Sequence, residues 1–146
     1  MSQLEIRAAQ IGDANVISSL LAQLGYDTAP SKIEVLVSMA ASGNNKICVG
    51  VLSGQVIAMM SVIFFNYFPS AEKLCRITSI IVDESVRGSG VGSKLIDYAR
   101  SIALAEKCSM LEVTTSLRRE QTQAYYESIG FQKTSYKYVQ KLEDNA

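Results

Sequence analysis

The sequence contains no histidine and no tryptophan, and it has only two prolines and three cysteines in 146 residues. Without histidine the chain cannot build a Ser-His-Asp triad or a Cys-His nucleophile pair. The cysteines, Cys48, Cys75 and Cys108, are far apart and form no Cys-x-x-Cys motif. They therefore indicate neither a zinc site nor a disulfide framework. We expect all three to be small buried residues in a reducing compartment.

The sequence also lacks an excess of charge of either sign and any long apolar run. Its 14 basic and 14 acidic residues give a formal net charge of zero, so bulk charge predicts no nucleic-acid partner. No apolar run reaches the roughly 18 residues of a membrane span. The first residues lack the basic and apolar regions of a signal peptide. We therefore expect a cytoplasmic protein without a membrane partner and without a bound metal.

What the sequence does contain is apolar material for one core, since 48% of its residues are hydrophobic. We expect residues 1–146 to form a single domain. Alternating or β-branched apolar runs predict strands at 4–7, 47–52, 56–65, 77–82, 110–114, 131–133 and 136–142. Helical spacing predicts helices capped at Asp13, at 31–42 with a capping box from Ser31 to Glu34, from 91 to about 103, and at 120–128. The crossover helix predicts that strands 77–82 and 110–114 are parallel.

The most informative stretch is the glycine-rich turn Arg87-Gly88-Ser89-Gly90-Val91-Gly92, which joins a strand to a helix. Its glycines allow positive φ angles and the close approach of a ligand. The N–H groups at the start of the helix are unpaired, and the helix dipole favours an anion there. Arg87 adds a planar fork of donors. The turn therefore predicts a pyrophosphate site, although it can also be read as a simple connection.

Two better-known glycine motifs do not fit this turn. A Walker loop needs Gly-Lys followed by Ser or Thr, but here Ser93 separates Gly92 from Lys94. A dinucleotide fingerprint that starts at Gly88 would need a glycine where Ser93 stands. A nucleotide-binding α/β domain would also need a second mononucleotide unit, for which too little chain remains.

Two motifs together resemble those of the GNAT acetyltransferases. Arg87-x-x-Gly90-x-Gly92 is similar to the coenzyme A signature of that family, and residues 124–131, Ala-Tyr-Tyr-Glu-Ser-Ile-Gly-Phe, are similar to its second signature. The resemblance implies an α+β fold. The expected sheet is mixed and mostly antiparallel, with about six to seven strands, four helices and one central parallel pair of strands that splay apart. The pantetheine arm of acetyl-CoA then enters the gap like an added strand.

The resemblance also implies the residues that bind acetyl-CoA as the co-substrate. The backbone of Ile80, Ile81 and Val82 is expected to contact pantetheine. The pyrophosphate is expected to lie against Arg87, Gly88, Ser89, Gly90, Val91, Gly92 and Ser93. In the family motif, the tyrosine before the glutamate, here Tyr126, protonates the departing thiolate. Tyr126 can alternatively be an aromatic anchor of a short helix, a role that we expect of Tyr125.

The acceptor side of the reaction is less defined by the sequence. Some relatives carry a glutamate as general base on the strand at 77–82, but here Arg76, Thr78 and Ser79 occupy the corresponding places. Asp83 and Glu84 lie at the phosphate end. Loops and flanking positions suggest a substrate-binding set of Tyr26, Asn66, Tyr67, Ser79, Thr115 and Arg119, with Asp27, Phe68 and Arg118 beside them.

We expect an N-acetyltransferase that acts on a primary amine of a small molecule by direct attack in a ternary complex. Neither a histidine nor an activated cysteine supports a covalent intermediate. The alternative is a module that binds acetyl-CoA without turnover and serves as a sensor or partner. A homodimer is a possible assembly, since exposed aromatic residues in loops can be either core edges or a dimer contact.

Overall fold

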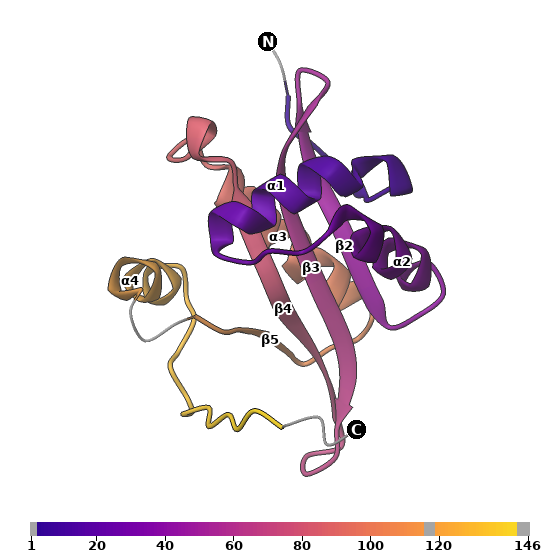
Figure 1. Ribbon diagram of the computed structural model, residues 1–146. Coiled ribbons are helices and arrows are strands. Elements are labelled where there is room, and N and C mark those ends of the chain that lie inside the picture. The colour runs from indigo at the N-terminus through magenta and orange to yellow at the C-terminus, as the bar shows by residue number, and fades with distance from the viewer. Residues whose placement is uncertain (1–2, 116–118, 143–146) are drawn as a thin grey trace. The chain divides into compact units, whose positions relative to one another are not determined.

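The computed structural model describes residues 3–115 and 119–142, in two compact units, residues 1–114 and 115–146. The first unit holds a five-stranded sheet in the order β1-β2-β3-β4-β5 (Figure 1). All neighbours are antiparallel except β4 and β5, which are parallel as predicted. The α+β class is thus confirmed, but the parallel pair lies at the edge of the sheet. The strands are β1 (Glu5–Ala8), β2 (Asn45–Leu52), β3 (Gln55–Tyr67), β4 (Glu72–Val82) and β5 (Met110–Val113).

Helices cover both faces of this sheet. On one face lie α1 (Ala14–Leu24) and α2 (Pro30–Ala40), and on the other lies α3 (Val91–Ala105) (Figure 1). The core below α1 and α2 brings apolar side chains of both helices onto β2, β3 and β4, among them Ile17, Leu20, Val49, Met59 and Ile81. On the opposite face, α3 contributes the fully buried side chains of Leu95, Ile96 and Ala99.

The second unit contains α4 (Glu120–Ser128), and residues 129–142 follow it without regular secondary structure. The strands predicted at 131–133 and 136–142 are therefore wrong, and the described sheet has five strands instead of six or seven. The pattern misled because alternation reflects β propensity, whereas a strand also needs a neighbouring edge for its backbone groups. Tyr136 and Tyr138 are 79% and 93% exposed. That residues 1–146 act as one domain remains a prediction.

The start of the second helix and the two predicted side-chain caps differ from the observed ones, whereas the starts after Asp13, at 91 and at 120 agree. α2 begins at Pro30, with Ala29 at the N-cap and no side-chain cap, so the capping box at Ser31 and Glu34 is wrong. Proline suits the first helical position because it has no N–H to leave unpaired. Asp13 also makes no cap bond to α1. Its carboxylate instead accepts hydrogen bonds from the Arg7 guanidinium at 2.8 and 3.1 Å and from the Gln10 N–H at 2.8 Å.

The central hairpin is longer than the sequence suggested. β3 continues through Tyr67 and β4 begins at Glu72, five residues before the predicted start. Charged residues such as Lys73 interrupt the apolar alternation in the sequence. A lysine can still belong to a strand, because its aliphatic stem covers apolar surface while its ammonium group reaches solvent. Asn66 and Tyr67 therefore belong to the end of a strand, where they pair with Lys73 and Glu72, and they are not loop residues.

The Asp13 carboxylate gives a first prediction. Asp13→Asn should lower the free energy of unfolding by about 1.5–3 kcal/mol, the usual contribution of hydrogen bonds to a charged group. The Arg7 hydrogen bonds hold the pKa of Asp13 below its usual value. The stabilisation should therefore be complete above pH about 4 and be lost as the pH falls through the lower folded-state pKa.

Denaturant unfolding at neutral and acidic pH measures this effect. Asp97→Asn is the matched control, because Asp97 pairs with Arg100 on the surface and is 71% exposed, so its loss should change stability little. An Asp13→Asn penalty that persists unchanged in acid would show that the carboxylate charge is not the cause.

The cysteines follow expectation. Cys48, Cys75 and Cys108 are all buried and free of disulfides. Burial raises the pKa of the Cys48 and Cys75 thiols to about 11, so neither forms a reactive thiolate near neutral pH.

No helix within the described ranges 3–115 and 119–142 is long and apolar enough to cross a membrane.

Candidate functional site

The most distinctive feature of the first unit is a free strand edge. β5 pairs with β4 only from Leu74 opposite Met110 to Ile77 opposite Val113. β4 continues to Val82, so within the described chain residues 78–82 have a sheet neighbour on the β3 side alone. This edge is about 13 Å long at the usual rise of a strand. A strand edge without a sheet partner can bind an extended ligand that hydrogen-bonds the backbone like an added strand.

A bulge marks the point where this edge begins. Ser61 pairs with Ser79 and Val62 pairs with Ile77, so Thr78 is an extra residue of β4. The bulge brings three hydroxyls together: Ser61 Oγ lies 2.7 Å from Thr78 Oγ1 and 2.5 Å from Ser79 Oγ. Bulges often re-aim side chains next to functional sites. Here the bulge places a small polar cluster at the start of the free edge.

The other end of the edge leads into the glycine turn. Gly88 and Gly90 have φ angles of 82° and 87°, and Gly90 is the N-cap of α3. A Cβ atom added at either glycine would meet no heavy atom of the protein within 4 Å. The space above the turn is therefore open, and the first N–H groups of α3 have no partner inside the helix. An anion can approach the backbone closely there.

One side chain of α1, Gln23, holds this turn in place together with Arg87 of the turn itself. Arg87 donates from Nε to the Val82 carbonyl at 3.0 Å and from Nη2 to Gln23 Oε1 at 3.4 Å. Gln23, on α1, also donates from Nε2 to Asp83 Oδ1 at 2.7 Å and accepts from the Glu84 N–H at 3.1 Å. Gln23 escaped sequence reasoning because it lies about 60 positions upstream. The sequence pointed to Gln23 only in that it is a polar residue near the end of an apolar helix.

The residues predicted to bind the cofactor share one edge and turn, from Ile80 to Ser93. Ile81 and Val91 are buried, while residues 87–90 are exposed. Ser89 Oγ donates to the Val86 carbonyl at 2.5 Å and so stabilises the turn itself. The predicted contacts of this segment with pantetheine and pyrophosphate remain predictions.

The predicted substrate residues of the first unit lie in different elements. Ser79 lies in the hydroxyl cluster, whereas Tyr26 follows α1 and is 61% exposed. No contact recorded between described residues joins Tyr26 to Asn66 or Tyr67 at the end of β3. Thr115 and Arg119 are exposed residues of the second unit, and Arg118 lies outside the described residues.

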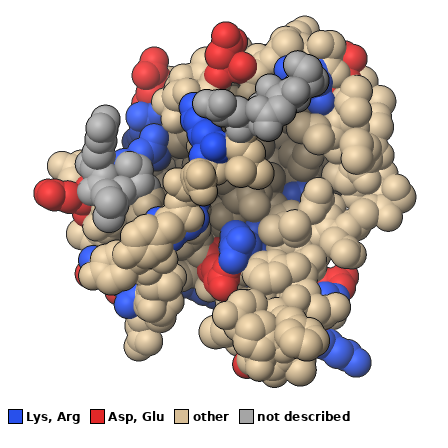
Figure 2. Space-filling model, turned by 60° about the horizontal axis from the view of Figure 1, so that its bottom comes forward, with Lys and Arg blue, Asp and Glu red and all other residues tan. Residues whose placement is uncertain are grey.

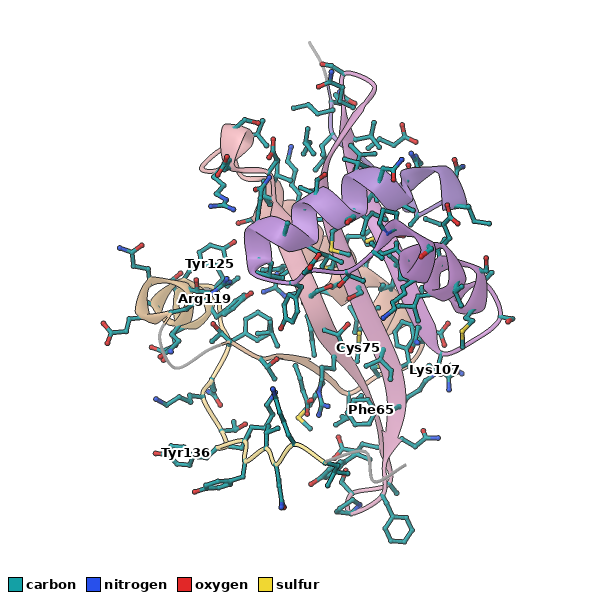
Figure 3. All side chains as sticks on the ribbon, viewed as in Figure 1. Phe65, Cys75, Lys107, Arg119, Tyr125 and Tyr136 are labelled. Atoms are coloured by element: carbon teal, nitrogen blue, oxygen red, sulfur yellow. The ribbon has the colours of Figure 1, made fainter. Side chains whose placement is uncertain are left out.

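Within the second unit, Tyr126 is the packed tyrosine of α4. Its ring lies 5.6 Å from that of Phe131 in an edge-on arrangement and 5.8 Å from that of Tyr125. Tyr125, labelled with Arg119 in Figure 3, is 36% exposed against 9% for Tyr126. The expectation that Tyr125 is the anchor is therefore wrong. Burial, and less strongly Tyr125, raise the pKa of Tyr126, and Arg119 opposes them. Tyr126 thus keeps its proton at neutral pH.

On the one face drawn in Figure 2, the charged side chains of the described residues do not gather into a patch of one sign. Figure 2 shows Lys and Arg interspersed with Asp and Glu over the described part of one face. The described residues contain no group of three or more His, Cys, Asp or Glu placed to hold a metal ion.

The glycine turn gives a second prediction. Gly90→Val should weaken coenzyme A binding at least about tenfold, because the branched side chain would occupy the open space and disfavour the positive φ angle. Gly54→Val is the matched control, since Gly54 has a φ of 77° and equally open surroundings in the β2–β3 turn. Calorimetry on both folded variants decides between the outcomes. Equal coenzyme A dissociation constants for the two variants would contradict the assignment of the phosphate site to this turn.

Comparison with known proteins adds a family assignment. A sequence profile described as the acetyltransferase (GNAT) family matches residues 18–131. An aminoalkylphosphonate N-acetyltransferase of Salmonella typhimurium is 22% identical over 90 residues, which are 62% of this chain. The match spans 58% of that relative's own length.

Solved structures agree with the fold. A transcriptional regulator from Bacillus halodurans superposes with a TM-score of 0.86 and 21% identity, covering 96% of this chain and all of that one. An aminoglycoside N-acetyltransferase in complex with CoA superposes with a TM-score of 0.85 and 16% identity. That superposition covers 99% of this chain and 97% of the other. Both superpositions show that this chain shares the fold of those structures.

Proposed function

Because the chain belongs to the GNAT acetyltransferase family, we propose that it transfers an acetyl group from acetyl-CoA to a primary amine of a small molecule. The observation that carries the proposal is the free edge of β4, which is followed, after a short 3-10 helix at Glu84–Val86, by the open glycine turn of α3. An extended arm that ends in a pyrophosphate matches this order of strand edge and anion site. The N-acetyltransferase relatives named above support the choice of an amine as acceptor.

In this proposal the residues of the edge and turn divide the binding of acetyl-CoA. The backbone of Ile80, Ile81 and Val82 hydrogen-bonds the pantetheine arm. The N–H groups at Gly90, Val91 and Gly92 face the pyrophosphate, while Arg87 and Gln23 hold the turn in shape. Acetyl-CoA supplies an activated thioester, and backbone N–H groups of β4 polarise its carbonyl oxygen.

Tyr126 is the proposed general acid. A thiolate with a pKa of about 8.5 leaves more readily when a phenol donates a proton to it. The raised pKa of Tyr126 keeps the phenol protonated at neutral pH, which a donor requires. The neutral amine nitrogen attacks the carbonyl carbon and gives one proton to water, the carbon–sulfur bond breaks, and the phenol proton passes to sulfur. Water then returns a proton to the phenolate.

The amine must lose a proton before or during attack. Asp83 is poorly suited to accept it, since hydrogen bonds from Ser85 and Gln23 lower its pKa. A carboxylate with a low pKa is a weak base. We therefore propose that the amine binds neutral or loses its proton to water, and that the attack is direct, within a ternary complex.

A specific observation keeps a second function open. The bulge of β4 carries hydroxyls at Thr78 and Ser79, at the places where the family resemblance led us to look for a glutamate base. A protein that binds acetyl-CoA without turnover, as a sensor or partner module, would need no such base. This alternative predicts coenzyme A binding without acetyl transfer.

Release of free thiol from acetyl-CoA across a panel of primary amines separates the two functions. The enzyme reading predicts amine-dependent thiol release, with a product that is heavier by one acetyl group in mass spectrometry. Tight coenzyme A binding with no product from any amine, lysine peptide or protein N-terminus would favour the binding module instead.

A further inference from the structure

The sheet face under α1 and α2 is only partly covered by these helices. Met59 and Ile81 lie in their core. Side chains alternate along a strand, so Ser61 and Phe65 of β3 are on the same face as Met59. Phe65 lies further along the strand than the part that α1 crosses (Figure 3). On β4, Ser79 shares this face with Ile81.

Arg76 occupies the same face, one step beyond the hydroxyl cluster. It pairs across the sheet with Ile63 of β3 on one side and with Glu112 of β5 on the other. Its Nε donates to Glu112 Oε2 at 2.7 Å. Its guanidinium carbon lies 4.8 Å from the centre of the Phe65 ring. Glu112 and Phe65 thus fix the position of the guanidinium from one edge and from below.

These contacts leave the outer part of the guanidinium unused. Within the described chain, the recorded partner of Arg76 is reached through Nε alone, and the side chain is 43% exposed. The two Nη groups therefore form a pre-positioned pair of donors on an open face. A planar guanidinium held in this way suits a carboxylate, phosphonate or phosphate, which accepts two parallel hydrogen bonds.

We propose that Arg76 binds an anionic group of the acceptor, so that the acceptor is a small amine that also carries a carboxylate, phosphonate or phosphate. The inference rests on the proposed acetyl transfer. Glu112 is a positioning residue that holds the guanidinium, and Phe65 is the surface on which it rests. The hydroxyls of Ser61, Thr78 and Ser79 lie where the amine would meet the free edge of β4.

The spacing along β4 sets the size of this acceptor. Thr78 is two residues beyond Arg76, which corresponds to about 7 Å along a strand. An amine separated from its anionic group by a few bonds spans such a distance between the hydroxyl cluster and the guanidinium. A neutral amine of equal size would leave the Nη groups to water and would gain nothing from them.

Matched amines test this proposal in the thiol-release assay. β-Alanine is compared with n-propylamine, and 2-aminoethylphosphonate and O-phosphoethanolamine are compared with ethanolamine. In the wild-type protein, kcat/KM should be at least about tenfold higher for an anionic amine than for its neutral match. Arg76→Gln should abolish this preference, and Arg76→Lys, which keeps the charge but not the fork, should retain only part of it.

Arg100→Gln is the control, because Arg100 also pairs with a carboxylate at 2.7 Å and is 41% exposed, but on the surface of α3. It should keep the full preference. Neutral amines that react as fast as their anionic matches would overturn the proposal, as would a preference that survives in Arg76→Gln.

Binding of ethylphosphonate, which has no amine, separates this proposal from the proposed function. Calorimetry in the presence of coenzyme A should detect its binding to the wild-type protein and to Arg100→Gln, and much weaker binding to Arg76→Gln. If no amine is acetylated, this result still establishes Arg76 as an anion site while the acetyltransferase reading fails. Equal binding to all three proteins, or no binding to the wild type, contradicts the role of Arg76.

Discussion

Tyr126→Phe is expected to lower kcat on the order of 10²-fold, the usual contribution of a general acid. The substitution keeps the ring that packs against Phe131 and Tyr125 and removes only the phenol proton. The dissociation constant of coenzyme A should barely change, because the phosphate site is assigned to the turn before α3. Steady-state kinetics with an acceptor from the amine panel, together with calorimetry for coenzyme A, measure both quantities.

Tyr125→Phe is the matched control on the same helix. Tyr125 has the more exposed of the two rings, so removal of its hydroxyl should leave kcat nearly unchanged. Thermal unfolding separates chemistry from packing, since a structural tyrosine would lower stability and a catalytic one would lower the rate alone. Full turnover in Tyr126→Phe, or damage in Tyr125→Phe instead, would mean that the thiolate takes its proton from water or another residue.

The second large effect is on the stability of the helix that carries the glycine turn. Leu95→Ala should lower the free energy of unfolding by about 3 kcal/mol, within the range for a fully buried leucine. Leu95 is 0% exposed between α3 and the sheet. The loss combines the transfer of the removed methyl groups with the cavity that remains. Chemical denaturation of both proteins measures the difference.

Leu104→Ala on the same helix is its control, because Leu104 is 73% exposed and its truncation should cost less than about 0.5 kcal/mol. Under conditions where Leu95→Ala remains folded, coenzyme A affinity should match the wild type, since the turn itself is unchanged. A penalty for Leu104→Ala as large as that for Leu95→Ala would show that the outer face of α3 is buried in the protein in solution.

The sequence predicted the features that rest on local chemistry. Positive φ at Gly88 and Gly90, the helix that follows them and the burial of the cysteines were all expected from residue type and spacing, and the structure confirms them. The order of elements through α4 was also expected. These features depend on a few neighbouring residues, so a pattern in the sequence is sufficient to indicate them.

Features that depend on distant partners were missed or misjudged. Gln23 holds the turn from α1, and Glu112 positions Arg76 from β5. No local pattern reports such contacts, because the partners meet only when the sheet and helices pack. The segment 131–142 shows the opposite error. Its alternation is strong, but a strand forms only where a neighbouring edge accepts its hydrogen bonds.

Calorimetric titration of the wild-type protein with coenzyme A, NAD and ATP tests the central claim most directly. The free edge of β4, the open turn and the failed Walker and dinucleotide spacings predict micromolar binding of coenzyme A. ATP and NAD should bind at least about tenfold more weakly, because neither offers an extended arm to the strand edge. NAD or ATP binding as tight as that of coenzyme A, or tighter, would contradict the assignment of this site to acetyl-CoA.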